Sequence, residues 1–413
     1  MKKGVVTLAA ILLPIIVLLV MESCARTVIT LRQDFTPPPV APKNPHGLPS
    51  RELGWEGYRD LDTAQKLDPT IPRIVAIGDS NTWGYGVEPQ AAWPAVLNRA
   101  LRQAVVLNMG TLGYSSFQGY GTLRKYGERL HASAIVASFN YNDRAYVYGP
   151  NVDSEEKFGQ IYDAQKKGNR YEWLNKIYMT RVIRYIGRKI GLIRPDPRVN
   201  IDVRDLEARV PPKNYAENLR RIVQYGRERN IPVIFILLKD NPHYTRHIRA
   251  GIEYRGRGNY ERAVRAFNIG LTNTVSGTLS RKYLAQTYEA MGNKEKAVEV
   301  GHMEGVLRNT ISGASIYLDQ DYNDLMIQVG QELGVKVVDA RPMLDADPDM
   351  FLDMCHPDEV GHARIAQLVL AALEEVAPAL AKDAVPISPT VADRKPAPER
   401  NGSSRSGPVC DCC

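Results

Sequence analysis

A serine, a histidine and an aspartate stand in local sequences that could support nucleophilic catalysis. Ser80 lies in Gly78-Asp79-Ser80-Asn81-Thr82, directly after a short apolar run, and Asp353 precedes His356 by three residues near the end of the chain. A serine hydroxyl attacks an acyl group only when a base takes its proton, and imidazole titrates in the useful range. A carboxylate three residues away can hold the imidazole in the required tautomer. The pattern indicates acyl-transfer chemistry, although a helix-capping role for Ser80 is the simplest alternative.

These residues must be positioned by the elements around them, and the chain alternates between two kinds of element. Five short, β-branched runs lack strict alternation, which is typical of strands buried on both faces: 73–77, 105–108, 134–138, 232–238 and 335–339. Helical stretches lie between them, for example at 93–103, 214–229 and 322–333. The pattern predicts a three-layer α/β/α sandwich with a five-stranded, mostly parallel, flavodoxin-like sheet and helical insertions. In such a sheet the active site forms at the carboxyl ends of the strands.

Two further blocks follow predicted strands, and together the four blocks carry a family resemblance. Residues 108–115 (NMGTLGYS) follow the second strand, and residues 140–143 (NYND) follow the third. With the Ser80 and His356 blocks, in this order, they resemble the GDSL or SGNH hydrolase family over about residues 72–373, apart from two inserted segments.

The resemblance implies a role for each matching residue. Ser80 matches the nucleophile, His356 the general base and Asp353 the carboxylate that orients it. The N–H groups of Ser80 and Gly113 and the side-chain amide of Asn142 match the oxyanion hole. No metal and no cofactor are implied.

Two departures from the family pattern are visible. The third block usually begins with glycine, but here it begins with Asn140, so the aim of the Asn142 side chain is open. The first block lacks the leucine of the family name and continues through 81–87 (NTWGYGV), which is similar to bacterial extracytoplasmic members.

The predicted hydrolase domain, residues 71–383, contains the two inserted segments. Residues 149–212 are rich in aromatic and basic side chains, with ten Lys or Arg against two acids between 166 and 198. A solvated helix face is one interpretation of that excess, and a basic lid near anionic lipid headgroups or substrate is the other.

The second inserted segment, residues 245–310, contains a repeat. The sequence at 258–264 (GNYERAV) returns at 292–298 (GNKEKAV), a period of thirty-four residues, and Tyr254 and Tyr288 keep the same interval. Its length and its Tyr, Gly and Ala positions resemble the tetratricopeptide repeat. Two units are too few for a free-standing solenoid, so we expect them to pack on the catalytic domain, with a protein partner as a further option.

The termini indicate the compartment. Lys2 and Lys3 precede an apolar run over residues 4–21, so residues 1–26 are predicted to be a signal-anchor or transmembrane segment, with cleavage or lipidation at Cys24 as alternatives. A Pro-rich spacer and lead-in follows over residues 27–70, and residues 384–413, with three of the five cysteines, are predicted to be a disordered tail. The catalytic domain is therefore expected outside the cytoplasm, periplasmic or at the cell surface, and anchored to the membrane.

Three functions fit these features. We favour a serine esterase that hydrolyses carboxylic esters of a glycan, a lipid or a small molecule through an acyl-serine intermediate. The alternatives are an O-acetyltransferase that acts on a cell-envelope polysaccharide with the same residues, and a repeat-mediated scaffold without activity.

The net charge of +7 over 413 residues is mild and no nucleic-acid motif accompanies it, so we expect no nucleic-acid partner. His362 is expected to support the last helix, Cys355 to be a small buried residue, and the pair His243 and His247 to be solvent-exposed side chains rather than metal ligands.

Overall fold

The computed structural model describes most of the chain between Gly47 and residue 387. The described residues are 14, 17–27, 47–147, 153–169, 177, 179, 182–183, 186–187, 190–192, 198–271, 277–307 and 319–387.

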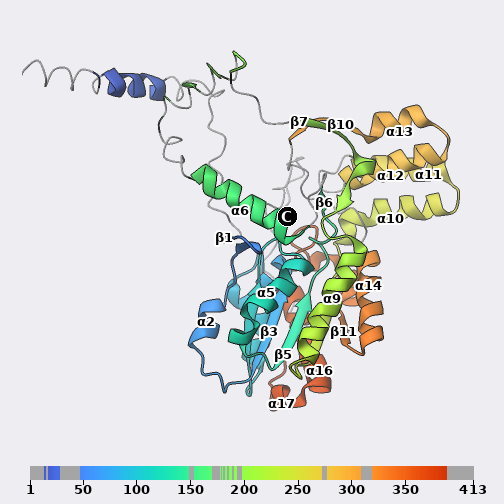
Figure 1. Cartoon of the computed structure of the whole chain (residues 1–413). Coiled ribbons are helices and arrows are strands. Elements are labelled where there is room, and N and C mark those ends of the chain that lie inside the picture. The colour runs from blue at the N-terminus through green and yellow to red at the C-terminus, as the bar shows by residue number, and fades with distance from the viewer. Residues whose placement is uncertain are drawn as a thin grey trace, which may run out of the picture.

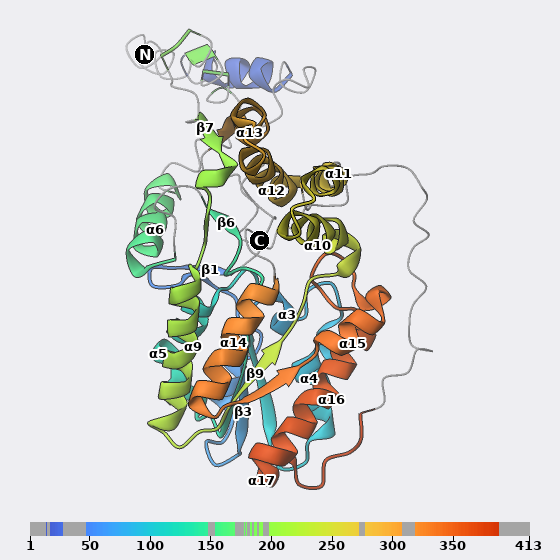
Figure 2. The same ribbon diagram turned by 90° about the vertical axis from the view of Figure 1, so that its right-hand side faces the viewer.

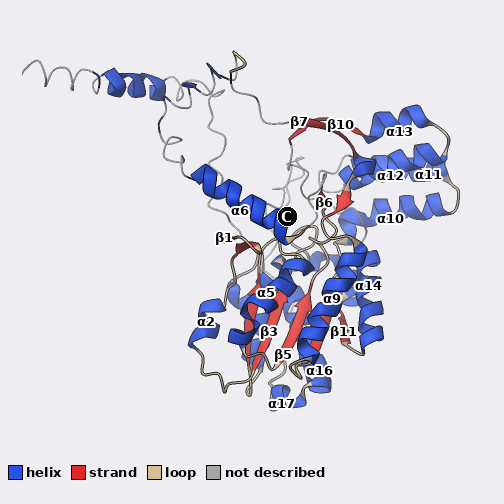
Figure 3. Cartoon of the chain, in the orientation of Figure 1, coloured by secondary structure: helices blue, strands red, loops and turns tan. Residues whose placement is uncertain are grey.

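Five parallel strands form the central sheet in the order β11-β9-β5-β3-β4. Figures 1 and 3 show this sheet with β3, β5 and β11 labelled. In chain order they are β3 (Arg73–Gly78), β4 (Val105–Gly110), β5 (Ala134–Ser138), β9 (Val233–Leu237) and β11 (Lys336–Asp339). All five predicted strands are present within two residues of their expected ends. The predicted parallel α/β sheet is therefore confirmed.

Helices cover both faces of the sheet, because successive strand side chains point to opposite sides. In β3, Val75 and Ile77 belong to one apolar cluster, and Ile74 and Ala76 belong to the other. The first cluster is closed by α2 (Leu61–Lys66), α5 (Ser116–Leu130), α9 (Pro212–Arg227) and α14 (Asp319–Leu333). The second is closed by α4 (Trp93–Ala100), α15 (Arg341–Ala346), α16 (Glu359–Val376) and α17 (Pro378–Ala381). Figure 2 shows the resulting three layers, as predicted.

The lead-in to the sheet folds against the first cluster. Strands β1 (Leu48–Ser50) and β2 (Gly54–Glu56) form an antiparallel hairpin, and Leu53 between them is 1% exposed. The sequence suggested a spacer and lead-in over residues 27–70. Residues 28–46 lie outside the described part of the chain, but from Gly47 onward the segment folds onto the core, because Leu53 and Ala64 are buried in the first apolar cluster.

The first inserted segment, predicted over residues 149–212, is preceded by β6 (Tyr146–Val147) and contains α6 (Glu155–Asn169). It ends with β7 (Arg198–Asp202), the short helix η3 (Val203–Asp205) and β8 (Glu207–Ala208), which pairs with β6. Much of the basic run, and with it the predicted lid, lies outside the described residues.

The second inserted segment contains two consecutive helical hairpins. They are formed by α10 (Pro242–Gly256), α11 (Tyr260–Leu271), α12 (Gly277–Ala290) and α13 (Lys294–Gly301). The repeated glycines occupy equivalent turns, with φ of +73° at Gly258 and +78° at Gly292, a conformation that favours glycine. The asparagine after each glycine accepts a hydrogen bond from the backbone N–H three residues later. The thirty-four-residue period thus corresponds to one hairpin.

The two inserted segments are joined to each other and to the core. Strand β10 (His302–Leu307), which follows α13, pairs antiparallel with β7. Ile248 and Phe267 of the hairpins are fully buried in the same apolar cluster as the sheet. The hairpins therefore pack on the catalytic domain, as expected.

The ends of the chain are described only in part. Residue 14 and residues 17–27 are helical, and the rest of the predicted anchor lies outside the described residues. The disordered tail predicted from residue 384 begins too early, because the Val385 N–H donates to the Ala100 carbonyl at 2.9 Å and Ile387 packs on the second apolar cluster. Residues 388–413 lie outside the described residues. Among the helices of the described residues, none is both long and apolar enough to cross a membrane.

Candidate active site

Ser80 follows the carboxyl end of strand β3, which lies between β5 and β4 in the sheet, and the chain turns there directly into the short helix α3 (Ser80–Trp83). Asp79 caps this helix, because its Oδ1 accepts a hydrogen bond of 2.9 Å from the Asn81 N–H. Gly78 permits the tight turn, since a Cβ at that position would lie 2.1 Å from Thr82 Oγ1. Ser80 is thereby held at the first position of a helix, where backbone N–H groups are unpaired and favour negative charge.

His356 and Asp353 reach Ser80 from a tight loop between the short helix η4 (Pro348–Met350) and α16. His356 Nε2 lies 2.8 Å from Ser80 Oγ, and His356 Nδ1 lies 2.7 Å from Asp353 Oδ2. Asp353 Oδ1 also accepts hydrogen bonds of 2.9 Å from the N–H groups of Cys355 and His356. The structure thus brings together three residues that lie up to 276 positions apart, in a continuous hydrogen-bonded chain.

The electrostatics of the chain favour an ionised Asp353. Burial acts to raise the pKa of this carboxyl, but the hydrogen bonds and the charge of His356 outweigh it and lower the pKa. The Tyr85 ring packs on the imidazole with its centroid 4.7 Å away, and His356 has no exposed surface. An ionised carboxylate on Nδ1 leaves Nε2 as the nitrogen that can accept the proton of Ser80.

The pKa of the Asp79 carboxyl is shifted in the opposite direction. Its burial raises its pKa to about 6, although the Asn81 N–H and the charge of His356 oppose the shift. Its Oδ1 is occupied by the helix cap, so its contact with the loop backbone is structural.

The two remaining predicted residues lie on loops after the neighbouring strands. Gly113 follows β4 in a turn with φ of +71°, and Asn142 follows β5. Asn142 Nδ2 donates a long hydrogen bond of 3.4 Å to Asp79 Oδ2, while Asn142 Oδ1 has no partner within the described residues. Both loops lie at the carboxyl edge of the sheet, and Ser80 lies at the same edge.

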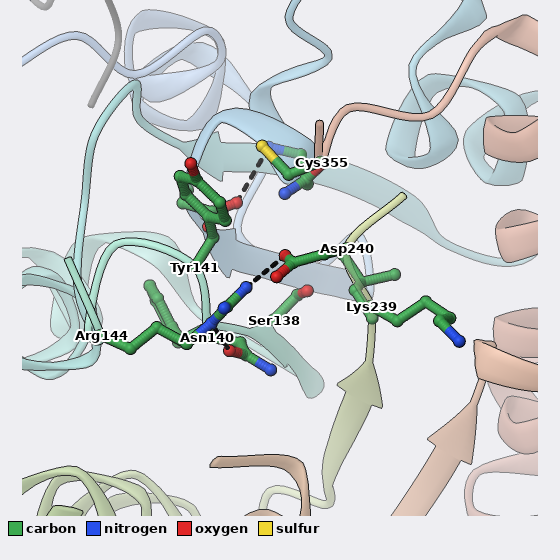
Figure 4. A pocket seen from close by; sticks show the side chains of 11 residues that line it. Ser138, Asn140, Tyr141, Arg144, Lys239, Asp240 and Cys355 are labelled. Atoms are coloured by element: carbon green, nitrogen blue, oxygen red, sulfur yellow. Dashed lines mark hydrogen bonds and ion pairs between the residues drawn. The ribbon is translucent and has the colours of Figure 1, made fainter. Parts of the chain in front are cut away.

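A buried polar cluster beneath the Asn142 loop was not predicted from the sequence. Figure 4 shows Arg144 pointing to Asp240, with which it forms an ion pair, while its Nε donates to Asn140 Oδ1 at 2.6 Å. Asn140 Nδ2 in turn donates to Asn323 Oδ1 at 2.8 Å. The asparagine in place of the usual glycine therefore has a structural use, since it links Arg144 to α14. Sequence patterns gave no signal for this pairing because Arg144 and Asp240 are 96 residues apart.

The other candidates of the sequence take structural positions. His362 is fully buried and its Nδ1 accepts the Trp93 N–H at 3.2 Å, and burial lowers its pKa to about 3. It joins α16 to α4, as expected. Cys355 is 4% exposed. His243 and His247 lie on α10 without a third metal ligand among the described residues.

One group of metal-ligating atoms occurs among the described residues, and it is part of the Ser80 site. It consists of Asp353, Cys355 and His356. Cys355 Sγ is 3.7 Å from His356 Nδ1 and 3.8 Å from Nε2, so the sulfur lies over the ring rather than in its plane. A metal on Cys355 would not meet the in-plane lone pair of either nitrogen, and the geometry fits a proton-transfer site better.

The sequence profile of the GDSL-like lipase/acylhydrolase family matches residues 76–364. The chain belongs to this family. The hydrolase is accordingly an SGNH-type esterase or acylhydrolase, an enzyme that acts on ester bonds.

Solved structures with low sequence identity are also similar to this hydrolase. A lipase/acylhydrolase from Enterococcus faecalis is 14% identical, covering 74% of this chain and 96% of that one, with a TM-score of 0.37. The corresponding values are 13%, 75%, 99% and 0.35 for TesA, and 10%, 73%, 99% and 0.36 for the acetyl xylan esterase AlAXEase. A search of curated proteins gave no match. The family assignment rests on the sequence profile alone.

Proposed function

We propose that Ser80 is the nucleophile of this hydrolase, with His356 as general base and Asp353 as the orienting carboxylate. The observation that carries the proposal is the continuous chain from Ser80 Oγ through the imidazole to Asp353, with distances of 2.8 and 2.7 Å. Both lie in the range of hydrogen bonds that transfer a proton during catalysis.

The reaction follows from these contacts. Ser80 Oγ attacks the carbonyl carbon of an ester, and its proton passes to His356 Nε2. The carbonyl oxygen becomes an oxyanion, which the N–H groups of Ser80 and Gly113 and the Asn142 amide stabilise. Collapse of this intermediate expels the alcohol, which takes the proton from His356 and leaves an acyl group on Ser80. Water then attacks that acyl group with the same base, and the carboxylic acid leaves.

We propose that the enzyme works outside the cytoplasm, attached to the membrane by its N-terminal segment. The support comes from the sequence, in which two lysines precede an uncharged apolar run over residues 4–21. If this is right, the full chain remains in the membrane fraction after a carbonate wash, and a protease added outside spheroplasts degrades the catalytic domain. Recovery of the chain in the soluble cytoplasmic fraction would contradict the proposed location and leave the catalytic assignment unaffected.

The catalytic assignment is tested with purified full chain and p-nitrophenyl acetate. We expect measurable turnover by the wild type, and a fall of kcat by about 10⁴-fold or more in Ser80→Ala, because the variant lacks the hydroxyl that forms the acyl intermediate. Thr82→Ser, two residues along the same helix, is the control and should retain turnover within about threefold. Equal rates for the wild type and Ser80→Ala would contradict the proposal.

A further inference from the structure

The loop that carries Gly113 is a β-turn over residues 111–114. The Tyr114 N–H donates to the Thr111 carbonyl at 3.2 Å, and Gly113, the third residue of the turn, has φ of +71°. Leu112 is not among the residues with positive φ, so the turn has the type II arrangement, in which glycine is favoured at the third position. Its central peptide consists of the Leu112 carbonyl and the Gly113 N–H.

The orientation of this central peptide is the difference between a type I and a type II turn. In the two types the carbonyl and the N–H of that peptide point in opposite directions. Glycine tolerates both conformations, so Gly113 itself does not fix the side to which its N–H points. A group that holds the Leu112 carbonyl does fix it, because the N–H of a planar trans peptide points away from its carbonyl.

Trp55 holds that carbonyl. Its indole Nε1 donates to Leu112 O at 2.9 Å from strand β2, which precedes the residues matched by the family profile. The indole is itself fixed by edge-on packing against Tyr114 and Phe158, with centroids 5.9 and 6.3 Å away. Tyr114 Oη also donates to the Trp55 carbonyl at 2.5 Å.

Arg209, at the end of the first inserted segment, holds the next carbonyl of the turn. Its Nη1 donates to Gly113 O at 2.7 Å, and its guanidinium lies 5.7 Å from the Trp55 ring centroid. Its Nε pairs with the buried Asp153 at 2.8 Å, and its Nη2 donates to Gln118 Oε1 at 2.6 Å. Both carbonyls that flank Gly113 are therefore engaged, whereas its N–H has no acceptor within the described residues.

We infer that Trp55 is a positioning residue of the active site, which locks the Leu112–Gly113 peptide so that the Gly113 N–H faces the oxyanion. The inference rests on the proposed function, because it assigns to Gly113 N–H the role of an oxyanion donor. It also gives the lead-in a part in catalysis that the family match does not cover.

The test is Trp55→Phe in the full chain, which removes the N–H donor and keeps an aromatic ring. Acylation and deacylation both pass through an oxyanion, so we expect kcat and kcat/KM to fall together by about 10- to 100-fold, with KM changed less than about threefold. This is less than the roughly 100- to 1,000-fold cost of removing a donor, because a freed peptide still samples the productive orientation. The inhibition constant of a trifluoromethyl ketone, which forms a tetrahedral adduct with Ser80, should rise by the same factor as kcat/KM falls.

Rates are expressed per active site, counted with a fluorophosphonate, so that misfolded protein does not enter the comparison. Tyr58→Phe is the matched control. The Tyr58 hydroxyl bonds to the side chains of Tyr114 and Thr122 in the same cluster, at 3.1 and 3.0 Å, but not to the Leu112–Gly113 peptide. We expect this variant to lose stability and to keep kcat per active site within about twofold.

If Trp55→Phe does not fold, the indole is replaced by benzothienylalanine, which has the same shape and lacks the N–H. A kcat per site within twofold of the wild type in the soluble variant would overturn the inference, as would a fall in kcat with an unchanged ketone inhibition constant. Either result leaves the proposed function intact. A wild type no faster than Ser80→Ala would overturn both.

Discussion

The proposed oxyanion donor at Gly113 is positioned by side chains from distant parts of the chain. Short sequence blocks, in the order typical of the GDSL or SGNH family, identified Ser80, Asp353 and His356 as candidates. Trp55 and Arg209 contact the Gly113 turn from 57 and 96 residues away. A hydrogen bond to a backbone carbonyl imposes no pattern on the neighbouring sequence, so no local signal could have identified either side chain.

Asp143, next to Asn142, gives a prediction about pH at this scale. It is fully buried, and burial raises its pKa from 3.8 to about 7, although hydrogen bonds from the Ser116 hydroxyl and N–H oppose the shift. The folded state therefore retains a proton that the unfolded state has lost between pH 4 and 7. The folded state binds more protons in this window, so Asp143 makes the protein less stable as pH rises, and the effect is complete above pH 7.

Asp143→Asn removes this titration. Between pH 5 and pH 8 we expect the free energy of unfolding of the wild type to fall by about 2–3 kcal/mol more than that of the variant. Urea unfolding at the two pH values measures the difference. Asp79 has a pKa of about 6 and titrates in both proteins, so its contribution cancels. If the free energies of unfolding of the two proteins change equally between pH 5 and pH 8, the burial of Asp143 does not cause the pH dependence.

At the scale of elements, the five strands were predictable because buried parallel strands form continuous apolar runs. The hairpins were predictable from the repeat, although their tetratricopeptide character stays a proposal. The sequence did not show that the lead-in belongs to the core. Its two strands have three residues each, which is too short for an alternation of apolar and polar side chains to be recognised. Its burial depends on partners that lie far along the chain.

The packing of α5 against Phe139, the residue after β5, provides a prediction for these elements. Gly119 lies inside this helix, where alanine would ordinarily add about 0.5–1 kcal/mol of stability. A Cβ there would lie 2.0 Å from Phe139 Cζ, in a ring that is 2% exposed. Overpacking of this kind costs about 1–3 kcal/mol, so we expect Gly119→Ala to lower the free energy of unfolding despite its helix propensity.

Gly256→Ala is the matched control for that substitution. Gly256 ends α10, and no atom lies within 4 Å of a Cβ built there. This variant should be neutral or more stable by up to about 1 kcal/mol in urea unfolding. Equal stability changes in the two variants would mean that the Phe139 contact does not limit the packing of α5.

At the scale of the whole molecule, the structure joins segments that the sequence presents as separate. The lead-in holds the Gly113 turn through Trp55, the first inserted segment holds it through Arg209, and β7 ties that segment to the hairpins through β10. Insertions of this kind have no common pattern from which their contacts could be read. The alternation of strands and helices predicted the sandwich, but it did not show how the lead-in and the two inserted segments pack on it.

Truncation tests this arrangement. A chain that starts at Gly47 keeps the β1–β2 hairpin, and we expect it to unfold cooperatively and to retain esterase turnover within about twofold. A chain that starts at Thr70 lacks Leu53 and Trp55. Loss of a large buried side chain such as Leu53 costs about 2–5 kcal/mol, against a total stability of roughly 5–15 kcal/mol. We expect this shorter chain to aggregate or to unfold in dilute urea. If it matches the longer chain in stability and turnover, the lead-in is dispensable.

The activation of Ser80 by His356 is measured most directly by fluorophosphonate labelling, with the modified residue mapped by peptide mass spectrometry. We predict a single modification on Ser80 of the wild-type chain, and labelling slower by about 1,000-fold or more in His356→Ala, because the serine proton then has no acceptor. Modification of a different residue, or equal rates in the two proteins, would contradict the account.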